Sequence, residues 1–291
     1  LNINIGLIST IENKINHKVL PTNFTTPDPI EINRLLSLMI ADGCDVCFME
    51  VSSHGIDQNR IIGLNFNIAI FSNITRDHLD YHHSFDEYMH TKKRFFDNLN
   101  SSAKSIINAD DEYASRMVMH TKSKIIFYGI NSQAHHTASI TDSSLSGLSL
   151  TISNIRLNTL LVGDFNAYNL LAVYAVALEL GQNQDEVLTL LSDIKPVLGR
   201  FNIIRSNKDV VGIVDYAHTP DALKQVIKSI SNFCSINRDL IIVLGCGGNR
   251  DKGKRSIMGK IAFENSNKVI FTSDNPRFEN QESILNDMCL E

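Results

Sequence analysis

The sequence lacks the features that would place it in several special classes of protein. Its 291 residues are 43% hydrophobic and 20% charged, yet no stretch approaches the roughly 18 consecutive apolar residues that a membrane-spanning helix needs. The formal net charge of -5 argues against a broad nucleic-acid surface, although a few local Arg or Lys residues can still hold a small anion. No internal repeat or low-complexity run is present. We therefore expect a globular protein that binds neither membrane nor nucleic acid.

Cysteine is too scarce and too irregularly spaced for a disulfide framework. The count is odd and no secretory signal is present, which favours the reducing cytoplasm; the five are Cys44, Cys47, Cys234, Cys246 and Cys289. Cys44 and Cys47 form a C-x-x-C, but no second cysteine pair or histidine pair follows at zinc spacing. We interpret them as structural. The chain starts at Leu1 rather than Met and stops inside an apparent helix, so we expect a piece of a longer chain.

Strand-like apolar runs alternate with helical patterns along most of the chain, which predicts an α/β fold with parallel sheets flanked by helices. The expected strands cover residues 45–51, 67–71, 105–108, 124–128, 210–214, 240–244 and 268–272, and the expected helices cover residues 88–96, 166–180, 184–192, 220–231 and 256–265. Short polar and apolar alternation between about 137 and 162 predicts an antiparallel insertion or an extension of the sheet. Pro196 and Gly199 mark a break. We place the domain boundary there, with a central parallel-sheet domain over 1–197 and the opening of a Rossmann-like domain over 198–291.

Two neighbouring strands end in polar residues, at the edge where open α/β sheets bind ligands. Glu50 ends the first strand and needs a counter-charge, either Mg²⁺ with nucleotide phosphates or a nearby Arg or Lys. His78 follows the second strand and is either a metal ligand or a residue that caps or packs on the next helix. Lys92, taken alone, is most simply a solvated charge on a helix.

Further polar groups surround these strand ends. Ser52, Gln58 and Arg60 offer hydroxyl, amide and guanidinium donors that suit a carboxylate or phosphate. Thr25 and Thr26 precede Pro27, where a helix N-cap is the simple interpretation.

The second half of the chain carries three more candidate segments. Asn166 and Asn169 share one face of a first helical turn, and capping explains Asn166 but not both. A Gly-rich turn over 245–255 follows a strand and can cradle phosphate, but it lacks the Walker spacing G-x-x-x-x-G-K-[ST]. Residues 274–277, Asp-Asn-Pro-Arg, follow another strand and are either a simple Asn-Pro turn or a recognition loop.

Three segments in order, residues 50–60, the Thr-Arg-Asp-His-Leu-Asp-Tyr-His stretch at 75–82 and the helix at 88–96, resemble the central domain of the Mur ligases, in particular the UDP-N-acetylmuramoyl-tripeptide synthetases. The resemblance extends over essentially the whole chain. It implies a central nucleotide-binding domain without its Gly-rich Lys-Thr phosphate loop, followed by an incomplete Rossmann-like ligase domain.

The resemblance also implies roles for individual residues. A carbamate on Lys92 would hold Mg²⁺ together with Glu50 and His78, and these three act in catalysis with Arg200. The residues implied to bind the UDP-muramoyl-dipeptide are Thr25, Thr26, Ser52, Gln58 and Arg60. Those implied to bind ATP are Asn166, Asn169, Arg200 and Asp215. Those implied to bind meso-diaminopimelate are Arg250, Asp274, Asn275, Pro276 and Arg277.

The implied activity is the addition of meso-diaminopimelate to UDP-N-acetylmuramoyl-L-alanyl-D-glutamate, driven by ATP with Mg²⁺, by a cytoplasmic monomer. One alternative is the same reaction with L-lysine. A second is another ligase of the superfamily, such as a folylpolyglutamate synthase or a cyanophycin synthetase, against which residues 52–60 and 274–277 argue. A third is a catalytically inactive fragment that only binds the muramoyl peptide.

Overall fold

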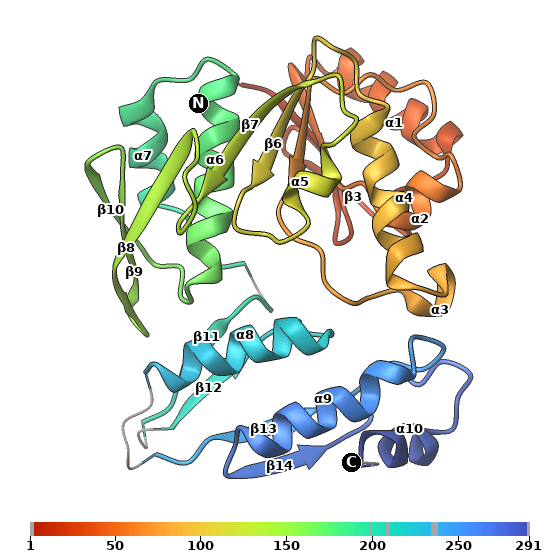
Figure 1. Ribbon diagram of the computed structural model, residues 1–291, viewed down its shortest axis with the longest axis vertical. Helices are drawn as coiled ribbons and strands as arrows, with labels where there is room; N and C mark the ends of the chain where they lie inside the picture. Colours follow the sequence, from red (N-terminus) through yellow and green to blue (C-terminus); the bar gives the residue numbers. More distant parts are fainter. Residues whose placement is uncertain (1–2, 198, 208–209, 234–237, 290–291) are drawn as a thin grey trace. The chain divides into compact units, whose positions relative to one another are not determined.

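The computed structural model describes residues 3–197, 199–207, 210–233 and 238–289, in which strands and helices alternate along most of the chain (Figure 1). The chain forms two compact units. The first consists of residues 1–67, 86–103 and 116–124, and the second of residues 68–85, 104–115 and 125–291. Within the described segments, no helix is both long and apolar enough to span a bilayer.

The first unit is built on a four-stranded sheet of order β3-β2-β1-β4. Strands β1 (Ile5–Ile8), β2 (Asn13–Ile15) and β3 (Lys18–Leu20) are antiparallel, and β4 (Val46–Met49) runs parallel to β1. The strand at β4 was predicted, whereas the antiparallel strands were not, because each is only three or four residues long and gives too little alternation to detect.

Helix α1 (Pro29–Ala41) packs its apolar side against β1. It begins at Pro29 because the Asp28 side chain accepts hydrogen bonds from the amides of Ile30 and Glu31. Helix α4 (Phe85–Asp97) contains the predicted helix at 88–96 and lies almost wholly in this unit. The short helix α2 (Ser53–Asp57) also lies in this unit, whereas the residues of α5 (Ala114–Met117) are divided between the two units.

The second unit contains a six-stranded sheet of order β10-β9-β8-β7-β6-β5. β5 (Ile68–Phe71) is parallel to β6 (Lys104–Asn108), and β7 (Lys124–Gly129) is parallel to β8 (His136–Ser144). β8 then pairs antiparallel with β9 (Gly147–Ile152), which pairs antiparallel with β10 (Ile155–Thr159). The predicted antiparallel insertion is thus confirmed as an extension of the sheet. Helix α3 (Leu79–His82) follows β5.

Helix α6 (Phe165–Glu179) packs on one face of this sheet, and α7 (Gln184–Ser192) follows it (Figure 1). Apolar residues occur on most sides of α6, as predicted, and Leu171, Tyr174 and Ala175 are at most 1% exposed. They join Ile106, Leu150 and other sheet residues in one core. This core fixes the first turn of α6, which carries Asn166 and Asn169.

The remaining part of the second unit holds two strand pairs. The strands of the parallel pair β13 (Ile241–Leu244) and β14 (Lys268–Phe271) were predicted. In the antiparallel pair, β12 (Val211–Val214) was predicted, whereas its partner β11 (Asn202–Arg205) was not. Helices α8 (Pro220–Ser231), α9 (Gly253–Glu264) and α10 (Gln281–Met288) bury Leu223, Met258 and Ile284 against β13 and β14. Helix α9 begins earlier than the predicted residue 256.

The described cysteines are free thiols, namely Cys44, Cys47, Cys246 and Cys289. The Cys44 Sγ lies 3.6 Å from Asn16 Oδ1, and the Cys47 Sγ lies 3.6 Å from its neighbour's carbonyl oxygen. Burial raises the pKa of the Cys47 thiol to about 11, so it stays protonated near neutral pH. Cys234 lies outside the described residues.

The α6 core gives a stability prediction. Leu171 is 0% exposed, whereas Leu160 is 57% exposed. Replacing Leu171 by Ala removes buried methyl groups and leaves a cavity, so we expect the free energy of unfolding to fall by about 2–5 kcal/mol. The matched control, Leu160→Ala, should change it by less than about 0.5 kcal/mol. Urea unfolding of the full-length protein measures both, and equal losses in the two variants would contradict this assignment of the core.

Candidate functional site

Thr26 is the buried centre of the first group of predicted site residues. It is 1% exposed, and its Oγ1 donates to the Glu50 carbonyl oxygen and accepts the Ser52 amide, both at 2.9 Å. Ser52 Oγ in turn accepts the Gly55 amide at 3.1 Å and caps α2. Thr26, Glu50 and Ser52 therefore lie together just after β4. The helix-cap interpretation of Thr26 is wrong, because Asp28 caps α1.

Arg60 is held in place beside this group. Its Nη1 donates to the Thr26 carbonyl oxygen at 2.7 Å, and its Nε and Nη2 donate to Gln58 Oε1 at 3.0 and 2.6 Å. Its guanidinium carbon also lies 5.3 Å from the centroid of the Phe24 ring. These contacts fix the positive charge without an acidic partner among the described residues, so it stays available to an anionic substrate group.

Thr10 holds the Glu50 side chain, a contact that sequence reasoning missed. The backbone amide of Thr10 donates to Glu50 Oε2 at 3.1 Å, and the Thr10 hydroxyl also hydrogen-bonds to Oε2. The same hydroxyl lies 3.1 Å from Thr25 Oγ1. Glu50 forms no ion pair with a described Arg or Lys, and its other carboxylate oxygen accepts no hydrogen bond from the described part of the chain. A threonine after a short strand gives no sequence signal by itself, which is why Thr10 was not predicted.

The structure shows the local contacts of the residues that were predicted to hold the metal ion. Lys92 in α4 is half-buried, with Nζ 5.3 Å from the centroid of the Tyr88 ring, so it is not the fully solvated charge of the simple interpretation. His78 precedes α3 with a φ of 56°, and its side chain makes no capping hydrogen bond. Its Nε2 lies 3.4 Å from Asp77 Oδ2. Glu50 and Lys92 belong to the first unit and His78 to the second.

Mg²⁺ prefers oxygen ligands, and the Lys92 ammonium group offers none. These three residues therefore suit Mg²⁺ only if Lys92 carries the carbamate that the resemblance implies. Over residues 3–197, 199–207, 210–233 and 238–289, no group of three or more His, Cys, Asp and Glu side chains is placed to hold a metal ion. The exposed Glu50 carboxylate and the His78 imidazole can each donate to one. The magnesium site therefore stays a prediction.

The two asparagines on α6 interact with each other. Asn166 Nδ2 donates to the Val162 carbonyl oxygen at 2.8 Å, and Asn169 Nδ2 donates to Asn166 Oδ1 at 3.1 Å. Asp164, not Asn166, occupies the N-cap position of α6, so the capping interpretation of Asn166 is wrong. Asn169 is exposed, and it is the asparagine of the two that can face a ligand.

Arg200 and Asp215 lie close together, at the β11–β12 pair. Asp215 Oδ2 accepts the amide of Phe201 at 2.7 Å, which ties the segment after Arg200 to the end of β12. The Arg200 guanidinium carbon lies 4.8 Å from the centroid of the Tyr216 ring. The structure thus brings together two of the residues predicted to contact ATP, the exposed Arg200 and the half-buried Asp215.

The loops that follow β13 and β14 interlock. The Gly248 amide donates to the Asn275 carbonyl oxygen at 2.9 Å. A Cβ atom at position 248 would lie 1.9 Å from the Pro276 carbonyl oxygen, and one at position 245 would lie 2.9 Å from the Asp274 Cβ. Only glycine permits approaches this close. The Gly-rich turn therefore packs against the loop at 274–277, where the predicted amino-acid-binding residues lie.

Two arginines lie on these interlocked loops. Arg277 Nη1 donates to the Gly248 carbonyl oxygen at 2.6 Å, and its backbone amide donates to Asn275 Oδ1 at 3.2 Å. Its φ of 49° lies in the left-handed region, which is uncommon for a residue other than glycine. Arg250 is exposed, and its guanidinium makes no hydrogen bond or ion pair with described residues. Both can meet carboxylates.

The buried Arg255 holds these loops in place through hydrogen bonds. The sequence analysis did not predict this role. This arginine is 1% exposed and donates to both carboxylate oxygens of Glu279 at 3.0 Å, to Asp287 at 2.8 Å and to the Gly247 carbonyl oxygen at 3.2 Å. The hydrogen bonds from Arg255 and from the amide of Asn249 lower the pKa of Glu279 to about 2. No spacing rule connects charges this far apart in the sequence, so only the folded chain shows the pair.

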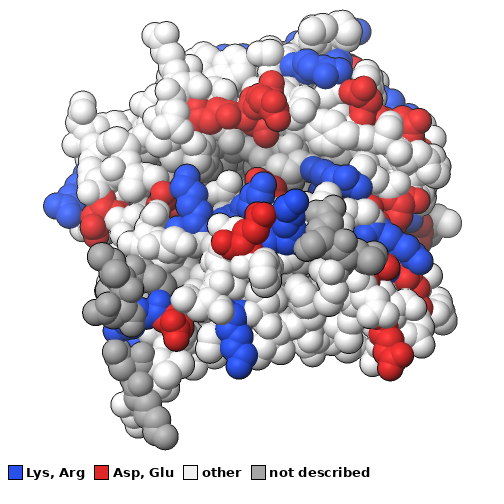
Figure 2. All heavy atoms as spheres, turned by 60° about the horizontal axis from the view of Figure 1, so that its bottom comes forward, with Lys and Arg blue, Asp and Glu red and all other residues white. Residues whose placement is uncertain are grey.

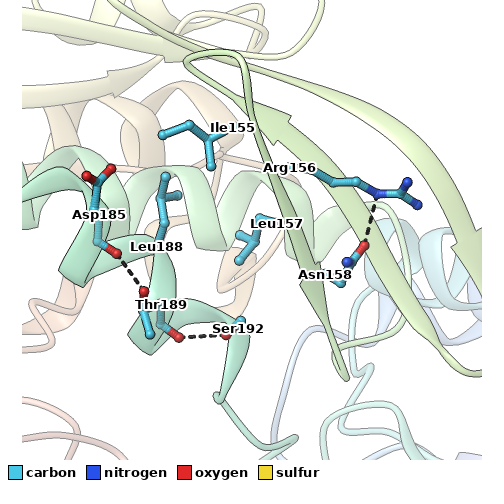
Figure 3. Close-up of a pocket in the computed structure, with 8 residues that line it drawn as sticks. All are labelled: Ile155, Arg156, Leu157, Asn158, Asp185, Leu188, Thr189 and Ser192. Atoms are coloured by element: carbon cyan, nitrogen blue, oxygen red, sulfur yellow. Dashed lines mark hydrogen bonds between the residues drawn. The ribbon is translucent and has the colours of Figure 1, made fainter.

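A pocket of about 650 Å³ lies elsewhere, between β10 and α7 (Figure 3). Figure 3 shows Arg156 and Asn158 on the strand and Asp185, Thr189 and Ser192 on the helix. Arg156 Nε already donates to Asn158 Oδ1 at 3.2 Å, and Thr189 Oγ1 to the Asp185 carbonyl oxygen at 2.8 Å. None of the predicted site residues lines it, and we assign it no role.

Charges of both signs occur on the face of the molecule drawn in Figure 2. Figure 2 shows Lys and Arg side chains interspersed with Asp and Glu on one face, without a broad area of a single sign. This distribution agrees with the formal net charge of -5.

Clusters of hydroxyl, amide and guanidinium groups thus lie at strand ends in successive α/β regions of the chain, an arrangement typical of enzymes that bind anionic ligands. The Mur ligase middle domain matches residues 1–177, and the Mur ligase glutamate ligase domain matches residues 199–290. The chain belongs to the Mur ligase family.

Individual relatives are more specific. The chain is 49% identical over 284 residues to the UDP-N-acetylmuramoyl-L-alanyl-D-glutamate--2,6-diaminopimelate ligase of Bacteroides thetaiotaomicron, covering 98% of the chain and 59% of the relative. It is 48% identical over 283 residues to the enzyme of that name from Phocaeicola vulgatus, covering 97% of the chain and 58% of the relative. The chain thus spans about three-fifths of the length of these relatives.

Two solved structures are similar to the chain. A structure of a UDP-N-acetylmuramoyl-L-alanyl-D-glutamate--2,6-diaminopimelate ligase is similar with a TM-score of 0.69 and 33% identity, covering 98% of this chain and 59% of that one. MurF from Acinetobacter baumannii has a TM-score of 0.71 at 15% identity, covering 100% of this chain and 71% of that one. The second similarity shows that the fold is shared.

The role of Thr26 can be tested by unfolding. Thr26→Val keeps the shape but removes the hydroxyl, which leaves the Glu50 carbonyl and the Ser52 amide without their partner, so we expect a loss of about 1–3 kcal/mol in the free energy of unfolding. The control is Thr22→Val, because the Thr22 hydroxyl bonds to Phe24 O at a solvent-exposed position. Urea unfolding of the full-length protein compares the two. A Thr26→Val variant as stable as the control would show that Thr26 does not organise the loop.

Proposed function

We propose that the protein to which this chain belongs joins meso-diaminopimelate to UDP-N-acetylmuramoyl-L-alanyl-D-glutamate with hydrolysis of ATP, in cytoplasmic peptidoglycan precursor synthesis. The observation that carries this proposal is the pair of interlocked loops that present Arg250 and Arg277. The names of the relatives that are 48% and 49% identical support the same substrates.

The first step is phosphorylation of the D-glutamyl side-chain carboxylate. One carboxylate oxygen attacks the γ-phosphorus of ATP, the bond from that phosphorus to the β,γ-bridging oxygen breaks, and ADP leaves as an acyl phosphate forms. In this proposal Arg60, Ser52 and Thr25 orient the muramoyl dipeptide in the first unit, on the loop that the buried Thr26 organises. Arg200 offsets charge on the transferring phosphoryl group, and Asp215 holds the ribose.

Glu50, His78 and a carbamate formed from Lys92 and CO₂ are the residues that would hold Mg²⁺. The ion would offset negative charge on the phosphates. In the chain itself, Thr10 fixes one oxygen of Glu50, so the orientation of this carboxylate is set before any ligand binds.

The second step is attack of the diaminopimelate amine on the acyl phosphate carbon. The C–N bond forms, the C–O bond to phosphate breaks, and inorganic phosphate leaves and takes up the proton that the amine loses. Arg250 and Arg277 would orient the amino acid by its carboxylates. Because Arg277 Nη1 already donates to Gly248, its Nε and Nη2 remain as donors to the distal carboxylate.

This arrangement distinguishes meso-diaminopimelate from L-lysine. The two amino acids differ by the distal carboxylate, and lysine would leave Arg277 with no anion to meet. A site built around a charged hydrogen bond discriminates strongly against the analogue that lacks the charge.

The specificity prediction uses an amino-acid panel with the full-length protein. ADP release is followed with meso-diaminopimelate, L-lysine and L-ornithine at equal concentrations, with ATP and the UDP-muramoyl-dipeptide in excess. We expect turnover with meso-diaminopimelate and at least about 100-fold lower kcat/KM with the other two. A preference for lysine would refute the substrate assignment, and the absence of ADP release with every amino acid would refute the ligase activity.

A second prediction concerns Arg277. Replacing it by Ala should lower kcat/KM for meso-diaminopimelate by about 30-fold or more, since a hydrogen bond to a charged group contributes about 2 kcal/mol, while the KM for ATP stays within about twofold. Arg156→Ala is the control, because Arg156 is also an exposed arginine, on β10, and its Nε donates to Asn158 Oδ1 away from the predicted site residues. If Arg277→Ala behaves like Arg156→Ala, Arg277 does not bind the amino acid.

A further inference from the structure

An exposed aromatic side chain lies among the predicted muramoyl-peptide residues of the first unit. Phe24 is in the loop before α1 and is 57% exposed. The apolar core of this unit is built elsewhere, from residues such as Ile8, Ile32 and Leu35, each 0% exposed. A ring left largely in solvent adds little to that core. Its contact with Arg60 therefore calls for an explanation other than packing.

The Arg60 guanidinium lies over the face of the Phe24 ring. Its carbon is 5.3 Å from the ring centroid, a distance at which the electron-rich face of an aromatic ring attracts a cation. Arg60 is half-buried, so water screens this attraction less than it would on an open surface. The planar guanidinium is also the cation that stacks best on a ring.

The hydrogen bonds of Arg60 hold the same guanidinium at its edge. Nη1 donates to the Thr26 carbonyl oxygen, and Nε and Nη2 both donate to Gln58 Oε1. Nη1 and Nη2 each carry a second N–H, and neither of these meets an acceptor in the described part of the chain. Arginine binds carboxylates through N–H groups of this kind, so two donors remain for an anionic ligand.

The backbone that carries the ring is held in place as well. Thr22 Oγ1 donates to the Phe24 carbonyl oxygen at 2.9 Å, and the Thr25 hydroxyl lies 3.1 Å from that of Thr10. An aromatic side chain has few rotatable bonds. Placing the Phe24 ring over Arg60 therefore costs little conformational freedom.

We propose that Phe24 is a positioning residue for the UDP-muramoyl-dipeptide, because its ring keeps Arg60 in the orientation that presents the two remaining N–H groups to the substrate. This inference rests on the proposed function. Gln58 and Thr26 fix the guanidinium at its edge, and Phe24 keeps it from tilting out of that plane. Without the ring, Arg60 would populate other orientations, and the cost of ordering it would weaken substrate binding.

The test measures KM for the UDP-muramoyl-dipeptide from ADP release by the full-length protein, with ATP and meso-diaminopimelate saturating. Phe24→Leu keeps an apolar side chain but removes the ring, so KM should rise about two- to fivefold, the factor for one cation–π contact. kcat should stay unchanged, because the contact acts equally in the bound and the reacting complex. Phe24→Tyr keeps the ring and should restore the wild-type KM.

Removing Arg60 shows whether Phe24 acts through it. Arg60→Ala should raise KM by itself, and adding Phe24→Leu to this variant should raise KM no further. The matched control is Phe263→Leu. Phe263 is a 75% exposed phenylalanine on α9, away from Arg60 in the sequence and in the second unit, and its replacement should leave KM unchanged.

The outcomes separate this inference from the proposed function. If Arg60→Ala raises KM but Phe24→Leu does not, the inference alone is overturned. A Phe24→Tyr variant as weak as Phe24→Leu also overturns it, as does a Phe24→Leu effect that persists without Arg60. An Arg60→Ala variant with the wild-type KM overturns it too, because Phe24 would then position a residue that does not bind the substrate. A wild type that releases no ADP with the UDP-muramoyl-dipeptide refutes the proposed function itself.

Discussion

The predicted site residues depend on buried or half-buried hydrogen-bonding groups that fix the loops at strand ends. Thr26 ties the segment after β4 to the loop before α1, Asp110 ties the loop after β7 to α6, and Arg255 ties the Gly-rich loop to Glu279. Breaking one of these hydrogen bonds would leave a buried polar group without its partner, at a cost of about 1–3 kcal/mol, so the bonds favour the observed loop conformations. Side chains that bind substrates can then remain exposed and still be positioned.

This constraint separates the residues that bind from those that support. Arg60, Asn169 and Arg250 are accessible or partly so, whereas Thr26 and Arg255 are at most 1% exposed. Thr26 was predicted to touch the substrate, but its hydroxyl already bonds to Glu50 and Ser52. Its hydroxyl therefore organises the loop, and Thr25, Ser52 and Arg60 are better placed to reach the muramoyl peptide.

The sequence predicted those strands and helices whose apolar residues recur at a regular spacing. The alternation of apolar runs predicted β4 to β7 and β12 to β14, and the apolar α6 was predicted as buried. Single-residue supports were not predictable, because Thr10, Asp110 and Arg255 find their partners far along the chain. The close approach at Gly248 was also hidden, since a Gly-rich turn after a strand is equally typical of a phosphate cradle. The Asn-Pro-Arg segment was informative only through its resemblance to a family.

Native-state hydrogen exchange of the full-length protein tests the central claim most directly. The amides of Ser52, Asn131 and Gly248 lie in loops, but each donates to a fixed partner, namely Thr26 Oγ1, Asp110 Oδ2 and the Asn275 carbonyl oxygen. If buried polar groups fix these loops, the three amides exchange at least about 100-fold more slowly than unstructured peptide, as stable hydrogen-bonded structure does. Exchange at the rate of unstructured peptide at these positions would contradict the account.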